Sequence, residues 1–334
     1  MRTLRTALTV AVVVSMPTVL SVRATVLTAS AALQAGQADR VKFVGTYRLV
    51  TTERKDASGK WEPTPNFNST GYITYSDTGY MGVHIMPKDR ARFAANQTTP
   101  DEAQAALRGY TAYFGSFTVD DKEKFVVHHR VGQINPGGDV DAKRFYDFVG
   151  DRLILTPAPA DGGGKDKATN HLIWERLPNP PLSAEAKKFV GFHKLLYTQS
   201  YTEKEAGVVT LGDKNETRAG TSYIIYTPTG HMMVHLIDKA GRTKYAGAQP
   251  TPEEALKAFR SYTGYFGRFV TYENQSPQFL VHVQEGTTSP GRAMDAKRFY
   301  VFTGNVLRLG GPPTTTNGET TGGYLFWERL PQLK

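Results

Sequence analysis

The sequence predicts an all-β fold: two tandem antiparallel β-barrels of about eight strands, each with one short helix. The first observation is a repeat with a period of about 150 residues. KFVG at 42–45 returns at 188–191, DAKRFY at 141–146 returns at 295–300, and WERLP ends both halves. The second is that apolar and polar residues alternate between short turn sequences, as half-buried strands require. One fold is therefore present twice.

Strands are predicted in the same order in both copies. In the first copy a strand begins at Gly45, and GYITYSDTGYMGVHIM from Gly71 forms a hairpin. The second copy has SYIIYTPTGHMMVHLI from Ser222 at the matching place. Further strands follow at YFGSFTV, KFVVHHRVGQ, KRFYDF, RLILT and HLIWERL. Closing such strands into a barrel removes exposed edges, and a β-sandwich is the alternative.

One helix interrupts the strands of each copy. Thr99, Pro100 and Glu102 supply an N-cap, a proline in the first turn and a capping-box acid. Thr251-Pro252-Glu253-Glu254 repeats this arrangement. We expect a helix to begin at each site.

The chain divides into four predicted parts. Residues 1–31 are expected to be a signal peptide, because Arg2 and Arg5 precede an apolar run too short to span a bilayer. Residues 41–178 form the first barrel, 179–187 a linker with paired prolines, and 188–334 the second barrel. We therefore expect a secreted or periplasmic protein with no membrane span after cleavage. An uncleaved membrane anchor is the alternative.

The composition argues against several kinds of site. The chain has no cysteine, which removes disulfides, thiolate metal sites and cysteine nucleophiles. The net charge is +9, but Lys and Arg are interspersed with acids and form no basic stripe. We expect no nucleic-acid partner, no cofactor and no metal site.

The order of these blocks resembles the lipocalin-like domain family of bacterial and fungal proteins, a branch of the calycin-type barrels. The resemblance rests on VGTYRLV, GYITYSDTGYM, the helix before GYTAYFG, FVVHHRV, the Arg-Phe-Tyr strand and the final WER. Lipocalins proper start with Gly-x-Trp, and a late Arg packs across that Trp. Gly45-Thr46-Tyr47 and Gly191-Phe192-His193 occupy this place, with Arg176 and Arg329 as the late arginines. The resemblance implies ligand binding inside a barrel, with no particular ligand.

A pair of strand residues suggests how an acidic ligand would be held. Arg144 and Tyr146 lie two residues apart and share a face, as do Arg298 and Tyr300. A guanidinium and a phenol side by side can clamp a carboxylate. The alternative is that Arg144 faces solvent or bonds the backbone of a loop.

Histidines recur at matched positions. His84 corresponds to His235, and His128 corresponds to His282. A histidine in an apolar row is a candidate polar handle inside a ligand cavity. The alternative is a core histidine bonded to a backbone carbonyl or a tyrosine hydroxyl. We also expect Gly82 and its counterpart Met233 to face the interior, so that the second cavity is the smaller.

These patterns predict an exported protein that binds a small hydrophobic or amphipathic molecule, at Arg144, Tyr146, His84, His128, Arg298, Tyr300, His235 and His282. Two alternatives stay open. One is an enzyme of the isomerase or cyclase type that uses the same cavity, which we consider less well supported because no nucleophile motif is present. The other is a structural or interaction barrel with a filled core.

Overall fold

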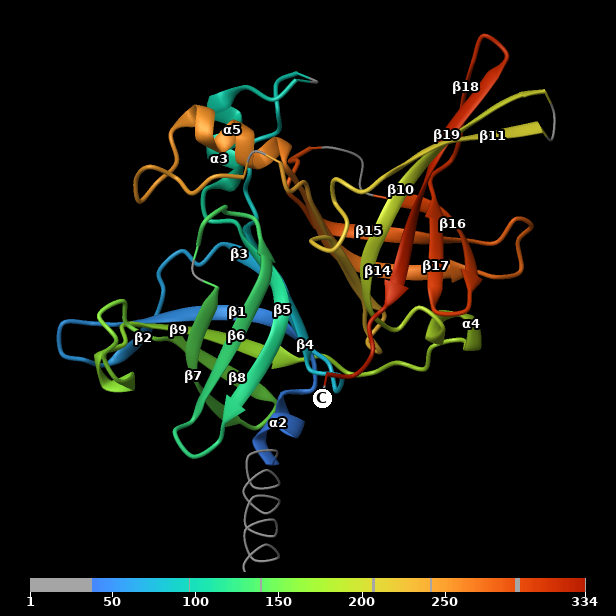
Figure 1. Cartoon of the computed structure of the whole chain (residues 1–334). Helices are drawn as coiled ribbons and strands as arrows, with labels where there is room; N and C mark the ends of the chain where they lie inside the picture. Colours follow the sequence, from blue (N-terminus) through green and yellow to red (C-terminus); the bar gives the residue numbers. More distant parts are fainter. Residues whose placement is uncertain are drawn as a thin grey trace, which may run out of the picture.

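Two β-barrels lie side by side in the computed structural model (Figure 1). The structure describes residues 38–333, except 96, 139, 206–207, 241 and 292–294. The predicted signal peptide therefore lies outside the described residues. The predicted fold class is confirmed: each barrel is a closed ring of eight antiparallel strands.

The first barrel is built from residues 45–176. Its strands are β1 (Gly45–Lys55), β2 (Trp61–Pro63), β3 (Ser69–Tyr75), β4 (Tyr80–Pro87), β5 (Thr111–Asp120), β6 (Phe125–Gln133), β7 (Asp141–Val149), β8 (Arg152–Pro157) and β9 (Asn170–Arg176). The spatial order is β2-β1-β3-β4-β5-β6-β7-β8-β9, and β1 also pairs with β9. This pairing closes the ring, and β2 is an additional strand at its edge.

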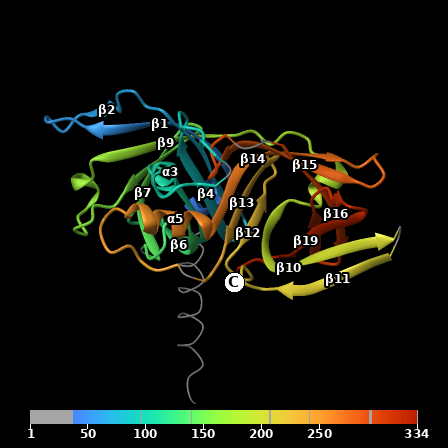
Figure 2. The same cartoon turned by 90° about the horizontal axis from the view of Figure 1, so that it is seen from above.

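The second barrel repeats this arrangement over residues 191–329. Its strands are β10 (Gly191–Glu205), β11 (Val208–Asn215), β12 (Tyr223–Tyr226), β13 (His231–Ile237), β14 (Tyr262–Tyr272), β15 (Phe279–Thr287), β16 (Asp295–Thr303), β17 (Val306–Gly310), β18 (Thr314–Thr316) and β19 (Glu319–Arg329). Pairing of β10 with β19 closes the ring. The strands β11 and β18 lie outside it, and Figure 2 shows β11 projecting with the end of β10.

Helices occupy two kinds of position. The predicted helices are α3 (Pro100–Leu107) and α5 (Pro252–Arg260), and both capping boxes are formed. They lie side by side across the two barrels (Figures 1 and 2). Two short helices that we did not predict, α2 (Ala38–Phe43) and α4 (Ala184–Lys187), precede β1 and β10. A 3₁₀ turn, η1 (Lys165–Lys167), lies between β8 and β9.

The α2 and α4 segments close one end of each barrel, which we call its base. Phe43 of α2 is fully buried against the rings of Tyr75, Tyr146 and Phe148, with centroids 4.8–5.1 Å apart. Phe189, which follows α4, is buried in the same way at the second base. Aromatic packing of this kind contributes apolar burial and favourable edge contacts.

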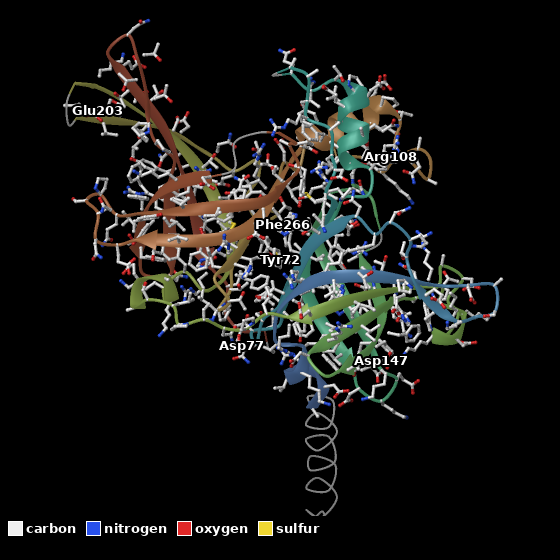
Figure 3. All side chains as sticks on the ribbon, turned by 180° about the vertical axis from the view of Figure 1, so that it is seen from behind. Tyr72, Asp77, Arg108, Asp147, Glu203 and Phe266 are labelled. Atoms are coloured by element: carbon white, nitrogen blue, oxygen red, sulfur yellow. The ribbon has the colours of Figure 1, made fainter. Side chains whose placement is uncertain are left out.

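Each barrel has its own hydrophobic core, and a further core lies between the outer faces of the two barrels. Its members come from both barrels and from α3 and α5; they are Tyr72, Met86, Ala103, Leu107, Tyr110, Ala112, Phe114, Ile134, Phe192, Tyr223, Ile225, Met233, Ile237, Ala255, Ala258, Tyr262 and Phe266. Figure 3 shows Tyr72 and Phe266 at this contact, and their centroids are 5.7 Å apart. The strands that meet there are therefore buried on both faces.

The contact has approximate two-fold symmetry, because matched residues of the two repeats play matched roles. Arg90 of the first repeat donates to the carbonyls of Thr287 and Thr288 in the second, at 2.5 and 2.9 Å. Its counterpart Arg242 donates to the carbonyls of Gln133 and Ile134 in the first, at 2.7 and 2.8 Å. Each arginine thus satisfies two carbonyls of the other barrel, and this ties the barrels together by hydrogen bonds as well as by apolar burial.

We expect Arg242→Ala to lower the free energy of unfolding by about 2–4 kcal/mol, because it leaves the Gln133 and Ile134 carbonyls without their donor. Urea denaturation followed by fluorescence measures this. The control is Arg260→Ala at the exposed end of α5, which should change stability by less than about 0.5 kcal/mol. Equal stability of the two variants would contradict the role given to Arg242.

We expect the free energy of unfolding to decrease as the pH falls below about 6.5, before most carboxylates titrate. Five histidines, His84, His128, His193, His235 and His282, are almost fully buried. Burial lowers the pKa of His84 and His282 to about 3 and that of His193 to about 4, and it lowers the other two pKa values well below normal. An unfolded histidine titrates near pH 6.5, so between that pH and the folded pKa the unfolded chain binds more protons.

Stability is therefore complete above about pH 6.5 and falls with decreasing pH, by up to about 1.4 kcal/mol per histidine per pH unit. Urea denaturation at pH 7, 6 and 5 should show this fall, with His129→Gln, a half-exposed site, keeping the same slope. Constant stability over this range would show that the buried histidines accept protons in the folded state.

Candidate functional site

A hydrogen-bonded chain of polar side chains crosses the interior of the first barrel. The completely buried imidazole of His128 on β6 bonds the Tyr75 hydroxyl through Nε2 and the Tyr113 hydroxyl through Nδ1, both at 2.8 Å. A neutral imidazole donates at one nitrogen and accepts at the other, so the two tyrosine hydroxyls satisfy both of its ring nitrogens. Burial and then the charges of Arg144 and Arg130 hold the pKa of His128 well below its usual range. The ring is neutral at pH 7.

The second barrel repeats this chain. His282 bonds the Tyr226 hydroxyl at 2.8 Å and the Tyr265 hydroxyl at 2.9 Å, and it is also completely buried. The pattern is thus a property of the repeat. Both histidines have the tyrosine partners that the alternative interpretation anticipated.

Arg144 adds a positive charge to this interior. It lies on β7 between Ala142 and Tyr146, which share its face and are buried, whereas Arg144 itself is half-buried. Its Nη1 donates to the carbonyl of Lys143 at 2.8 Å, and the charge acts on the nearby His128. Among the described residues no carboxylate forms an ion pair with it.

The matching residue Arg298 makes the same contact in the second barrel. It donates to the carbonyl of Lys297 at 2.9 Å and bonds the Tyr265 hydroxyl. We call Tyr75, Tyr113, His128 and Arg144 the first cluster, and Tyr226, Tyr265, His282 and Arg298 the second cluster.

The first barrel has one more arginine at this place. Arg130 lies two residues beyond His128, and its guanidinium is 4.5 Å from the centre of the Tyr113 ring. It also donates to Gln133 at 3.1 Å. The second barrel has Gln284 at the corresponding position. The first cluster therefore has a neighbouring arginine that the second cluster lacks.

Tyr146 does not present its hydroxyl to Arg144 as a free donor. That hydroxyl donates to Asp39 of α2 at 2.8 Å, at the base of the barrel. Lys124 and Lys42 bond the same carboxyl and hold the pKa of Asp39 well below its usual range. Tyr300 lies in the same place in the second barrel, where burial and then Glu185 raise its pKa. In the second barrel the tyrosine that bonds the interior arginine is Tyr265, and in the first barrel the charge of Arg144 acts on Tyr75 and His128.

His84 and His235 lie outside the barrel interiors, which corrects their predicted position. Their rings stack on each other at the contact between the barrels, with centroids 4.2 Å apart. Each Nδ1 bonds a tyrosine hydroxyl, Tyr110 at 3.0 Å and Tyr262 at 2.7 Å. Because β4 and β13 are buried on both faces, their apolar pattern does not distinguish the interior from the outer face.

Gly82 and Met233 also face this contact, so the expectation that they shape the interiors is wrong. A Cβ on Gly82 would come within 2.4 Å of Ile225 of the other barrel. Met233 belongs to the core shared by the two barrels. Neither residue indicates which barrel has the larger cavity.

The late arginine of the family pattern packs as the resemblance implies. The guanidinium of Arg176 lies 4.6 Å from the centre of the Tyr47 ring and donates to the carbonyls of Val44 and Lys42. In the second barrel Arg329 donates to the carbonyl of Lys188, and His193 donates through Nε2 to Phe189. Tyrosine and histidine thus take the place of the tryptophan.

The described part of the chain offers neither a metal site nor a membrane-spanning helix. Over the described part of the chain, no three His, Asp or Glu residues come together as possible metal ligands. Nor does any helix in that part have the length and apolar character needed to cross a membrane.

Comparison with known structures gives weak similarities. A protein of unknown function of the DUF3598 family from Nostoc punctiforme is 9% identical, with 86% of this chain and 96% of that chain covered and a TM-score of 0.21. Intact Ap-TbpB, with its N and C lobes, is 9% identical over 81% and 63% of the two chains, with a TM-score of 0.20. Transferrin binding protein B from serogroup B Neisseria meningitidis is 8% identical over 86% and 76%, also with a TM-score of 0.20. At these TM-scores the similarities support no further conclusion.

The comparison by sequence is more informative. No curated protein matches the chain. The model of the lipocalin-like domain, however, matches residues 44–177 and 215–330, one stretch in each barrel. This chain belongs to the lipocalin-like domain family.

Proposed function

We propose that the protein is an exported binding protein that holds a small amphipathic molecule with an acidic head group inside its first barrel. The observation that carries the proposal is Arg144, a half-buried arginine on the inner face of β7 with no carboxylate partner among the described residues. A buried or half-buried guanidinium is costly unless an acceptor compensates it. An anionic ligand would supply that acceptor. Export is inferred from the sequence of residues 1–31 alone.

The tyrosine–histidine chain prepares a second donor for the same ligand. With the His128 proton on Nδ1, Tyr75 donates to Nε2 and Nδ1 donates to Tyr113. The Tyr113 hydroxyl hydrogen is then left to donate to a ligand oxygen. Tyr113 is 6% exposed and Tyr75 only 1%, so Tyr113 is the more accessible end of the chain. Arg144 and Tyr113 together replace the Arg144–Tyr146 pair that the sequence suggested.

The apolar part of the ligand would lie toward the end of the barrel opposite α2. Phe67, Ile85 and Leu172 pack against the interior core and are only partly buried. They lie at the end of the barrel opposite α2, because Ile85 is late in β4 and Leu172 is early in β9. Partly exposed apolar side chains next to a positive cluster favour an amphipathic ligand.

Catalysis is not part of this proposal. Both ring nitrogens of His128 bond tyrosine hydroxyls, so the imidazole has no free nitrogen to accept a proton from a ligand. The first barrel is preferred to the second because only it has Arg130 beside the cluster.

Replacing Arg144 by methionine keeps the length of the side chain and removes its charge. We expect Arg144→Met to weaken binding of decanoate by about tenfold or more and to leave binding of decanol unchanged, because only the acid uses the charge. Isothermal titration calorimetry measures both ligands. The matched control is Arg298→Met in the second barrel. Undiminished decanoate binding by Arg144→Met would refute the proposed role.

Two tyrosine variants separate the proposed donor from the predicted one. Tyr113→Phe should weaken decanoate binding by several-fold, whereas Tyr146→Phe should not, because the Tyr146 hydroxyl bonds Asp39. Thermal melts should accompany the titrations, since Tyr113→Phe also removes a partner of His128. The opposite order of effects would return the ligand to the Arg144–Tyr146 pair.

A further inference from the structure

A separate cleft lies between the bases of the two barrels. It has a volume of about 420 Å³, within the range of small-molecule pockets. Both repeats line it with matched segments, the starts of β1 and β10 and the ends of β9 and β19. In Figure 3 Asp77, one of its lining residues, lies at the lower junction of the barrels. Tyr75 and Tyr226, which bond the interior histidines, also line the cleft, but Arg144 and Arg298 do not.

The two late arginines give this cleft a positive wall. Arg176 and Arg329 both line it, and neither forms an ion pair with a carboxylate among the described residues. Asp77 is the one acidic residue in the lining, and its side chain is exposed to solvent. The balance of charge in the lining is therefore positive.

The guanidinium groups of Arg176 and Arg329 differ in how many hydrogen bonds they already form. Arg176 is held by the carbonyls of Val44 and Lys42, by the Tyr47 hydroxyl and by the Tyr47 ring. Within the described chain, the guanidinium of Arg329 has one hydrogen bond, to the Lys188 carbonyl, because His193 stands where the first repeat has Tyr47. A guanidinium has five N–H donors, so Arg329 has most of its capacity available.

The rest of the lining is largely apolar on the side of the second barrel. Phe192 is buried there and stacks on Tyr80 of the first barrel, with centroids 5.6 Å apart. Val190 and Leu330 line the cleft beside it. An apolar wall beside an available guanidinium is suited to a molecule with an apolar body and one negative group.

We infer that this cleft is a second binding site, for a small amphipathic anion whose head group bonds Arg329 and whose apolar part contacts Phe192 and Leu330. The inference does not depend on the proposed function of the barrel interior, because the two sites share none of the residues that would bind the head group. Both repeats are needed to form it, so a single barrel would lack it.

Calorimetric titration of the full chain with decanoate, and with decanol as the uncharged analogue, tests the inference. We expect Arg329→Met to weaken binding of one equivalent of decanoate by about tenfold and to leave decanol unaffected. The matched control is Arg308→Met on β17, where the arginine lies over the Tyr324 ring and does not line the cleft. It should titrate as the wild type does.

A second variant tests the same site if Arg329→Met does not fold. Val190→Phe fills the cleft without touching a charge, and it should remove the same equivalent of decanoate while the thermal melt stays unchanged. Loss of an equivalent in Arg144→Met but not in Arg329→Met or Val190→Phe would overturn the inference and leave the barrel site standing. Loss in the latter two alone would overturn the barrel site instead. Absence of any decanoate binding would refute both.

Discussion

The hydrogen bonds of one buried, neutral histidine to two tyrosines organise the interior of each barrel. His128 and His282 can be completely buried only because both ring nitrogens are satisfied. This requirement places a polar chain among aromatic side chains that otherwise fill the base, and it brings the chain to the same face as Arg144 and Arg298. A positive charge beside a satisfied polar chain is the feature on which the proposed anion site rests.

The second constraint is that two barrels share one core. The strands at their contact are buried on the inside by aromatic residues and on the outside by the other barrel. Arg90 and Arg242 each bond carbonyls across the contact, and His84 stacks on His235 near its centre. Such an arrangement fixes the two bases relative to each other, and the cleft between them follows from it. The tandem repeat is thus one structural unit with features that neither half has alone.

Local signals in the sequence predicted most of the fold and part of the site. The repeat, the hairpin turns and the capping boxes at Thr99 and Thr251 act over a few residues, so the sequence shows them directly. The partner of Tyr146 could not be predicted in this way, since Asp39 lies 107 residues earlier on a helix too short to give a pattern. The predicted position of His84 inside the barrel was wrong for a different reason. Both faces of its strand are apolar, and alternation then carries no information about the side on which a residue lies.

The charge state of a bound acid tests the central claim most directly. Decanoate labelled with ¹³C at its carboxyl carbon reports its own pKa when it is titrated in the complex by NMR. If its carboxylate lies beside Arg144, its pKa falls below that of free decanoate, and Arg144→Met abolishes the fall. A carboxyl buried in an apolar interior without the arginine would instead show a raised pKa. That result, unchanged by Arg144→Met, would contradict an anion site in the barrel.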